Sequence, residues 1–162
     1  MEPIDLNEQS PDAIREFKTA LKKEALNSLW QKKVGLQTQL VALQEAASAD
    51  TKSSAGDKYE TGRESIRQSR TLLEKQWNTL AQWESAVQAL PVEPTPTVSE
   101  GALVVLDIGW VWVSVSFGKI IFRQREIQSV SSASPLVQAL KGKGKGEAAL
   151  FRGKAIEIRG LM

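Results

Sequence analysis

The sequence has 162 residues, of which 41% are hydrophobic and 25% are charged, a balance typical of one or two small soluble domains rather than of a disordered chain. It contains no cysteine and no histidine, which excludes disulfide bonds, thiol nucleophiles, histidine-based catalytic triads and ordinary structural zinc sites. The formal net charge is only +2, so the total does not indicate a strong nonspecific nucleic-acid binder, although the C-terminal part is the more basic one.

The N-terminal end has no pattern typical of export. The first nine residues include acidic side chains where a signal peptide would carry a basic and then an apolar stretch. No run of eighteen apolar residues occurs in the sequence. We therefore expect a cytoplasmic protein with no membrane partner.

The first long segment, from residue 11 to about residue 49, has the pattern of an amphipathic helix. It has no interior proline, and its apolar residues recur at steps of three and four. Ser10 supplies a hydroxyl for the N-cap, and Pro11 lacks an N–H where the first turn does not need one. The apolar positions are Ile14, Phe17, Leu21, Ala25, Leu29, Leu36, Leu40, Leu43 and Ala47.

A second helical segment runs from about residue 57 to residue 90, and Pro91 ends it. Gly35 and Gly62 weaken the two helices locally. Both apolar stripes are too narrow to stabilise such long helices alone, so we predict an antiparallel coiled-coil hairpin over residues 1–90, with its tip at about 49–56. The second stripe consists of Tyr59, Ile66, Leu73, Trp77, Leu80, Ala81, Val87 and Leu90.

Three prolines within residues 91–100 predict an extended, semi-rigid linker rather than a packed element. Beyond it the hydrophobic period changes to two. In residues 110–117, Trp110 and Trp112 fall on one side and three valines on the other, which predicts a strand with one firmly buried face. Residues 102–108 are predicted to be its hairpin partner.

Further short strands and one short helix complete the predicted C-terminal domain, residues 101–162. Ser134 and Pro135 repeat the N-cap and first-turn proline pattern, and Gly142 ends the helix. The predicted fold class is therefore α+β, a helical hairpin followed by a β-rich domain. The other predicted strands are residues 120–122, 127–130, 148–151 and 155–158, the last two joined by a turn at Arg152-Gly153.

The segment from residue 134 onward resembles the C-terminal signature of the Gre transcription elongation factors, S-P-L-x-x-A-L-x-G-K-x-x-G-D/E followed by a pair of strands. In that family the segment belongs to an FKBP-like domain preceded by a coiled-coil hairpin, so the resemblance covers nearly the whole chain. It implies an FKBP-like C-terminal domain, although such a motif defines a fold better than an activity. The matching positions are Ser134, Pro135, Leu136, Ala139, Leu140, Gly142, Lys143, Gly146 and Glu147.

At the hairpin tip the match to the family is poorer. Gre factors present the tip sequence G-D-L-S-E-N-A-E-Y, whose acidic pair helps to hold a magnesium ion in the polymerase active site. With Ser54 and Tyr59 placed on the family's serine and tyrosine, the two acids fall on Lys52 and Ala55. The family's catalytic carboxylates are therefore missing in this register.

Two nearby acids could replace them. Asp50 and Asp57 could supply oxygen ligands, since magnesium needs only one or two protein oxygens when phosphates and water complete its shell. The alternative for Asp57 is structural, because Asp57 and Glu60 have the spacing of a capping box, and Asp50 is equally compatible with a solvated loop. The candidate catalytic residues are thus Asp50, Asp57 and Glu60, with no intrinsic cofactor and any magnesium shared with the polymerase.

The resemblance implies a bacterial factor, not itself an enzyme, that docks on RNA polymerase by its C-terminal domain. Its hairpin tip would enter the secondary channel and modulate elongation or initiation, with only indirect contact to nascent RNA or DNA, and a monomer is expected. The residues expected to bind the partner are Lys52, Ser54, Asp57, Lys58, Tyr59, Arg63, Ser134, Pro135, Leu136 and Lys143.

Three alternatives stay open. The first is an active transcript-cleavage factor that uses substitute tip carboxylates. The second is an FKBP-like protein-binding or chaperone module, and the third is a self-associating coiled-coil scaffold.

The tryptophans and the glycine-lysine run have simpler interpretations. Trp110 and Trp112 could form a base-stacking platform, but the serines that continue this side of the strand bring no basic residue. The run at residues 141–146 lacks the P-loop spacing, and we expect a basic surface turn. The residues expected to pack near the base of the hairpin or against the β-rich domain are Trp30, Trp77 and Trp83.

Overall fold

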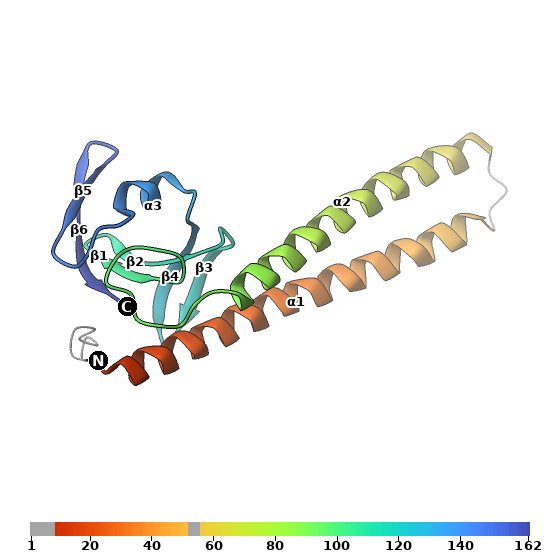
Figure 1. Ribbon diagram of the computed structural model, residues 1–162. Coiled ribbons are helices and arrows are strands. Elements are labelled where there is room, and N and C mark those ends of the chain that lie inside the picture. The colour runs from red at the N-terminus through yellow and green to blue at the C-terminus, as the bar shows by residue number, and fades with distance from the viewer. Residues whose placement is uncertain (1–8, 52–55) are drawn as a thin grey trace. The chain divides into compact units, whose positions relative to one another are not determined.

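The computed structural model describes residues 9–51 and 56–162, with side chains for all of these except residues 50–61. Two long helices are followed by a β-rich domain that contains one short helix (Figure 1). The predicted α+β class is thus confirmed. The elements are α1 (Pro11–Thr51), α2 (Gly56–Gln88), β1 (Leu103–Leu106), β2 (Gly109–Ser114), β3 (Gly118–Phe122), β4 (Arg125–Ser131), α3 (Pro135–Leu140), β5 (Ala148–Phe151) and β6 (Lys154–Leu161).

The chain forms two compact units. The first consists of Met1–Leu26 together with Ser85–Met162, and the second consists of Asn27–Glu84. The division crosses both long helices. The first unit therefore contains the sheet, the N-terminal part of α1 and the last residues of α2, and the second contains the rest of the hairpin.

The helix boundaries follow from local chemistry. Ala13 N donates a hydrogen bond to Ser10 Oγ at 3.1 Å, which satisfies one of the first-turn N–H groups that have no partner inside the helix. Both helices end within two residues of the predicted positions, the usual uncertainty of a helix boundary.

In the second unit the two helices run antiparallel (Figure 1). They are joined by a narrow apolar seam. Leu29 and Leu36 of α1 are buried, as are Leu73 and Leu80 of α2. In the part of the chain with described side chains, α1 has no buried residue after Leu36, and α2 has none before Leu73. The seam is therefore thinner toward the tip.

Six strands form the sheet in the order β3-β4-β2-β1-β6-β5. The predicted hairpin of β1 and β2 is confirmed, with Val104 opposite Val111, and so is the final pair, which turns at Arg152-Gly153. β2 and β4 run parallel, with Trp110 opposite Ile127, whereas the other neighbouring pairs are antiparallel. β2 is thus a central strand, paired on both sides.

The sheet is covered on both of its faces, and both covers belong to the first unit. On one face α3 contributes Val137 and Leu140 to a core that contains Val104, Val111 and Val113 of the sheet. On the other face the ring of Phe17, from α1, lies 6.5 Å from that of Trp110 and 5.2 Å from that of Phe122, measured between centroids.

The prediction that the second strand has only one buried face is therefore wrong. Residues 111–114 are all buried, and the side chain of Trp112 is only 1% exposed. The cover over the second face comes from α1, which lies far earlier in the chain. An alternating pattern within one strand carries no information about such a distant cover.

The proline-rich segment is packed, which contradicts the expectation of an unpacked linker. Val98 is 1% exposed and belongs to the core beneath α3. Its N–H donates to the Lys143 carbonyl oxygen at 2.9 Å, and its own carbonyl accepts from Gly142 N at 3.1 Å. Prolines remove N–H donors but leave every carbonyl, so a proline-rich segment can still be fastened by hydrogen bonds.

Candidate functional site

The signature segment begins at the cap of α3. Ser134 has extended backbone angles, φ −65° and ψ 149°, and its Oγ accepts a hydrogen bond from Val137 N at 3.3 Å. Leu140 is buried in the core. The serine and this leucine of the signature are therefore explained by folding, because one starts the helix and the other anchors it to the sheet.

The turn after α3 accounts for the glycines of the signature. Gly142 has φ +78° and Gly146 has φ +85°, a region in which any residue with a side chain is strained. The carboxylate of Glu147 accepts a hydrogen bond from Gly144 N. A Cβ at residue 144 would lie only 3.0 Å from the Pro96 carbonyl oxygen. The glycine at this position is the only sign of that close contact in the sequence. The expected basic surface turn is confirmed, with Lys141 and Lys145 exposed.

Some signature side chains lie wholly or partly at the surface. Pro135 is exposed on the first turn of α3, and Leu136 is half-buried at the edge of the core. The Lys143 side chain makes no ion pair within the described residues, although its backbone holds Val98. We call these three residues, Pro135 and Leu136 in the first turn of α3 and Lys143 in the turn after it, the candidate docking surface.

A buried lysine fastens α1 to the proline-rich segment. Lys18 is 1% exposed, and its Nζ donates to the Glu93 carbonyl oxygen at 3.0 Å. Burial lowers the pKa of Lys18 to about 8, and the Glu93 carboxylate opposes part of that shift. Lys22 Nζ donates to the carbonyls of Gln88 and Leu90, both at 2.8 Å. Sequence reasoning missed this cluster, yet Lys18 lies at helical spacing within the predicted apolar stripe.

The tip candidates fall largely outside the described side chains. Lys52 and Ser54 lie outside the described residues. Asp50 lies in the last turn of α1 and Asp57 in the first turn of α2, so the backbone places both at the helix ends that border the tip. Glu60, Lys58 and Tyr59 follow on α2 with their side chains outside the description, and Arg63 is exposed.

Two of the hairpin tryptophans lie around a lysine in the second unit. Lys33 Nζ lies 4.6 Å from the ring centroid of Trp77 and 5.9 Å from that of Trp30, and it pairs with Glu84 at 3.4 Å. The expectation that Trp30 is packed is nevertheless wrong, because Trp30 is 57% exposed. It shares a helical face with Val34, which is also exposed.

The base-stacking alternative for Trp110 and Trp112 is overturned. Trp112 is buried, and the guanidinium carbon of Arg125 lies 4.0 Å from the ring centroid of Trp110. Phe17 covers the same ring from α1. Trp112 therefore offers no open face to a nucleic-acid base, and the ring of Trp110 is already in contact with Arg125 and Phe17.

Two further observations concern only the described part of the chain. No group of three or more acidic side chains there could hold a metal ion. No helix there is long and apolar enough to cross a membrane.

No family model and no curated protein matches the chain. Several chains of solved structures do, including the two that follow. One, described as the structure of the transcription factor Gfh1, is 18% identical, with 86% of this chain and 94% of that chain covered and a TM-score of 0.38. The other is the crystal structure of GreA factor homolog 1 (Gfh1) protein of Thermus thermophilus, which is 17% identical, with 85% and 94% covered and a TM-score of 0.33. Both are distant similarities, and neither assigns a function to this chain.

Proposed function

We propose that this protein is a Gre-type transcription factor that binds RNA polymerase. Its C-terminal domain, FKBP-like by resemblance, docks on the polymerase, and its hairpin tip enters the secondary channel and modulates elongation or initiation. The observation that carries the proposal is that the residues of the signature segment fall into two groups, those that build the fold and those that remain at the surface. Most of its residues build a cap, a core contact or a turn, whereas the Pro135 ring is exposed and the Lys143 side chain makes no ion pair within the described residues.

The candidate docking surface has a chemistry suited to a protein partner. Pro135 is rigid and exposed, so it can be buried against a partner at little cost in conformational entropy. Lys143 adds a positive charge that makes no ion pair with any described residue, and this charge favours an acidic partner surface and speeds association. Leu136 supplies a partly exposed apolar edge beside them.

The hairpin supports the second half of the proposal. The 41 residues of α1 extend about 60 Å at about 1.5 Å per residue, long enough to reach into a deep channel. The seam thins toward the tip, and a narrow probe with a polar end suits passage through a wet channel.

The tip chemistry separates two modes of action. With Lys52 and Ala55 in the positions of the family's two acids, the tip lacks its usual carboxylates and would occupy the channel without promoting RNA cleavage. Asp50 and Asp57 border the tip and support the other mode, in which they share a magnesium ion with the polymerase.

The decisive experiment is binding of the purified full chain to core RNA polymerase. We expect the wild type to bind and both Pro135→Glu and Lys143→Glu to bind about tenfold more weakly, since each places a new charge on the candidate docking surface. Lys154→Glu is the matched control, because Lys154 is exposed at the turn between β5 and β6. Absence of wild-type binding would sink the proposal.

Transcript cleavage in backtracked complexes then decides between the two modes. Release of short 3′ RNA fragments that is lost in Asp50→Asn and Asp57→Asn would establish the substitute-carboxylate mode. Polymerase binding with no cleavage, but with altered pausing or initiation, would establish the channel-occupying mode.

A further inference from the structure

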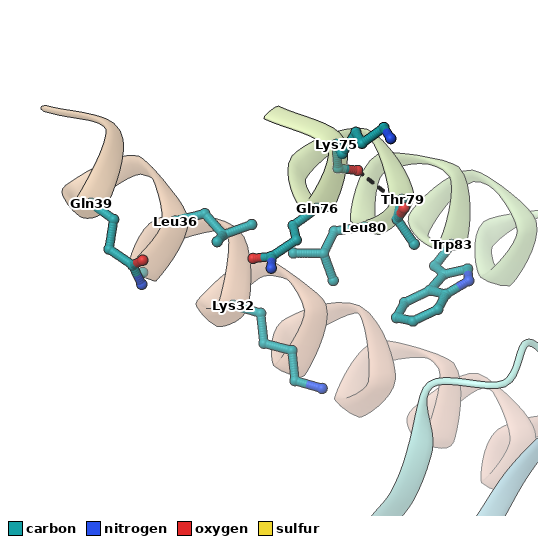
Figure 2. A pocket seen from close by; sticks show the side chains of 9 residues that line it. Lys32, Leu36, Gln39, Lys75, Gln76, Thr79, Leu80 and Trp83 are labelled. Atoms are coloured by element: carbon teal, nitrogen blue, oxygen red, sulfur yellow. Dashed lines mark hydrogen bonds between the residues drawn. The ribbon is translucent and has the colours of Figure 1, made fainter. Parts of the chain in front are cut away.

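The second unit contains a groove that the proposed function does not use. It lies between α1 and α2, encloses about 470 Å³, and has Leu36 and Leu80 at its floor (Figure 2). The indole of Trp83 extends the apolar lining along α2. A groove of this size and lining can take side chains from the apolar face of a helix.

Gly35 keeps the groove open. It is helical and has no positive φ, and a Cβ built on it would meet no atom within 4 Å. Glycine lowers helix stability relative to alanine, and neither backbone strain nor a close contact requires it at this position. Because Gly35 has no side chain, the space beside Leu36 stays open.

A positively charged lysine flanks the groove on each helix. Lys32 lies on α1 and Lys75 on α2, at the two sides of the apolar lining (Figure 2). Neither lysine has an ion-pair partner in the described part of the chain, and the residues three and four positions away from each are uncharged. No acidic side chain lines the groove.

The apolar character continues along α2 toward the tip. Leu72, four residues before the groove-lining Gln76, is 57% exposed. The spacing places it on the same side of α2 as Gln76. The available surface is therefore longer than the groove itself.

We propose that this groove binds an amphipathic helix of a partner protein that carries acidic residues beside its apolar face. Its apolar side chains enter the groove over Leu36 and Leu80, and its carboxylates pair with Lys32 and Lys75. A second copy of this chain fits poorly, because a two-fold symmetric contact through the groove would place lysines of one copy near lysines of the other. Its residues are not those of the candidate docking surface or the tip, and its test needs no polymerase, so either proposal can fail alone.

The test uses the full chain and a designed peptide. The probe is a fluorescein-labelled helical peptide with leucine at i, i+3, i+4 and i+7 and glutamate on both flanks of that stripe. A matched peptide carries lysine in place of each glutamate. We expect saturable binding of the glutamate peptide by fluorescence anisotropy, and binding of the lysine peptide about tenfold weaker.

Variants assign the binding to the groove. The double reversal Lys32→Glu with Lys75→Glu should weaken the glutamate peptide and strengthen the lysine peptide, each by about tenfold. Lys23→Glu with Arg67→Glu is a charge-matched control at two exposed positions outside the groove lining. Gly35→Leu should abolish binding by filling the groove, whereas Asn78→Leu, exposed on α2 and outside the lining, should leave it intact.

Several results would overturn the proposal. Equal binding of the two peptides, equal losses in the charge reversal and its control, or no binding up to the solubility limit would each do so. Binding of a labelled single-stranded oligonucleotide that the groove reversal abolishes would make this a nucleic-acid site instead. Sedimentation of the wild type as a dimer that Gly35→Leu dissociates would make it a contact between copies.

Discussion

At the scale of single residues, Lys18 is a charged side chain that is only 1% exposed. Its burial lowers its pKa from 10.5 to about 8, so between these values the unfolded chain binds a proton that the folded chain does not. The free energy of unfolding must therefore rise with pH across that window. Below about pH 8 the charged form is buried in the folded state, and its desolvation lowers stability.

We expect urea denaturation to report this linkage. The wild type should gain about 2 kcal/mol between pH 8 and pH 10 relative to Lys18→Met, whose buried side chain cannot titrate. Lys23→Met, at an exposed position on the same helix, should follow the wild-type profile. If Lys18→Met shows the same pH dependence as the wild type, the buried lysine does not control stability in this range.

The turn between β3 and β4 stores backbone strain. Arg123 has φ 50° and Gln124 has φ 66°, although neither is a glycine or an asparagine. Gln124→Gly should raise the free energy of unfolding by about 0.5 to 1 kcal/mol. Gln128→Gly, at an exposed position inside β4, should instead lower it by a similar amount, since its backbone is already extended. Thermal denaturation of both variants would show whether the opposite signs occur.

At the scale of elements, sequence patterns predict the features that are formed by residues close together in the chain. The cap at Ser10, the hairpin of β1 and β2, and the turn at Arg152-Gly153 follow from local spacing and are present. The parallel pairing of β2 with β4 and the cover of Phe17 over Trp110 join distant segments, which no local pattern specifies. The packed proline-rich segment was missed for the same reason.

The candidate site was predictable to a similar degree. The signature positions can be found from the residue types alone. Only the structure distinguishes the residues that stabilise the fold from those whose side chains remain at the surface for a partner. Ser134 is among the residues expected to bind the partner, yet its hydroxyl accepts the hydrogen bond that caps α3. The groove beside Gly35 has no sequence motif, because it is produced by the pairing of two helices.

The ion pair of Lys33 and Glu84 joins the two helices of the hairpin. Their side chains are 13% and 23% exposed, and Glu84 Oε1 is buried with no hydrogen-bond partner among the described residues. Lys33→Met should lower the free energy of unfolding by about 1 to 2 kcal/mol, because it leaves the carboxylate partly buried without its cation.

The double variant Lys33→Met with Glu84→Leu should recover most of that loss, since both charges are then removed. A double-mutant cycle from urea denaturation measures the coupling. Strictly additive losses in the double variant would show that the two side chains do not depend on each other.

At the scale of the whole molecule, burial predicts a gradient of local stability. Amide hydrogens of β2 should exchange slowest, because this strand is paired on both sides and buried on both faces. Those of residues 37–49 should exchange faster, since no side chain of that part of α1 is buried. Hydrogen exchange followed by mass spectrometry resolves the two segments, and equal protection of both would contradict this ranking.

The pairing of β1 with β6 has a consequence for the order of events on the ribosome. β1 meets β2 almost at once, but its other edge stays unpaired until residues 154–161 have been synthesised. Val104 and Leu106 then also lack Ile156 and Ile158, their neighbours in the core. The hairpin helices are complete well before this point, whereas the nascent sheet exposes an open, apolar edge. During that interval the protein should be most prone to aggregation and most dependent on chaperones.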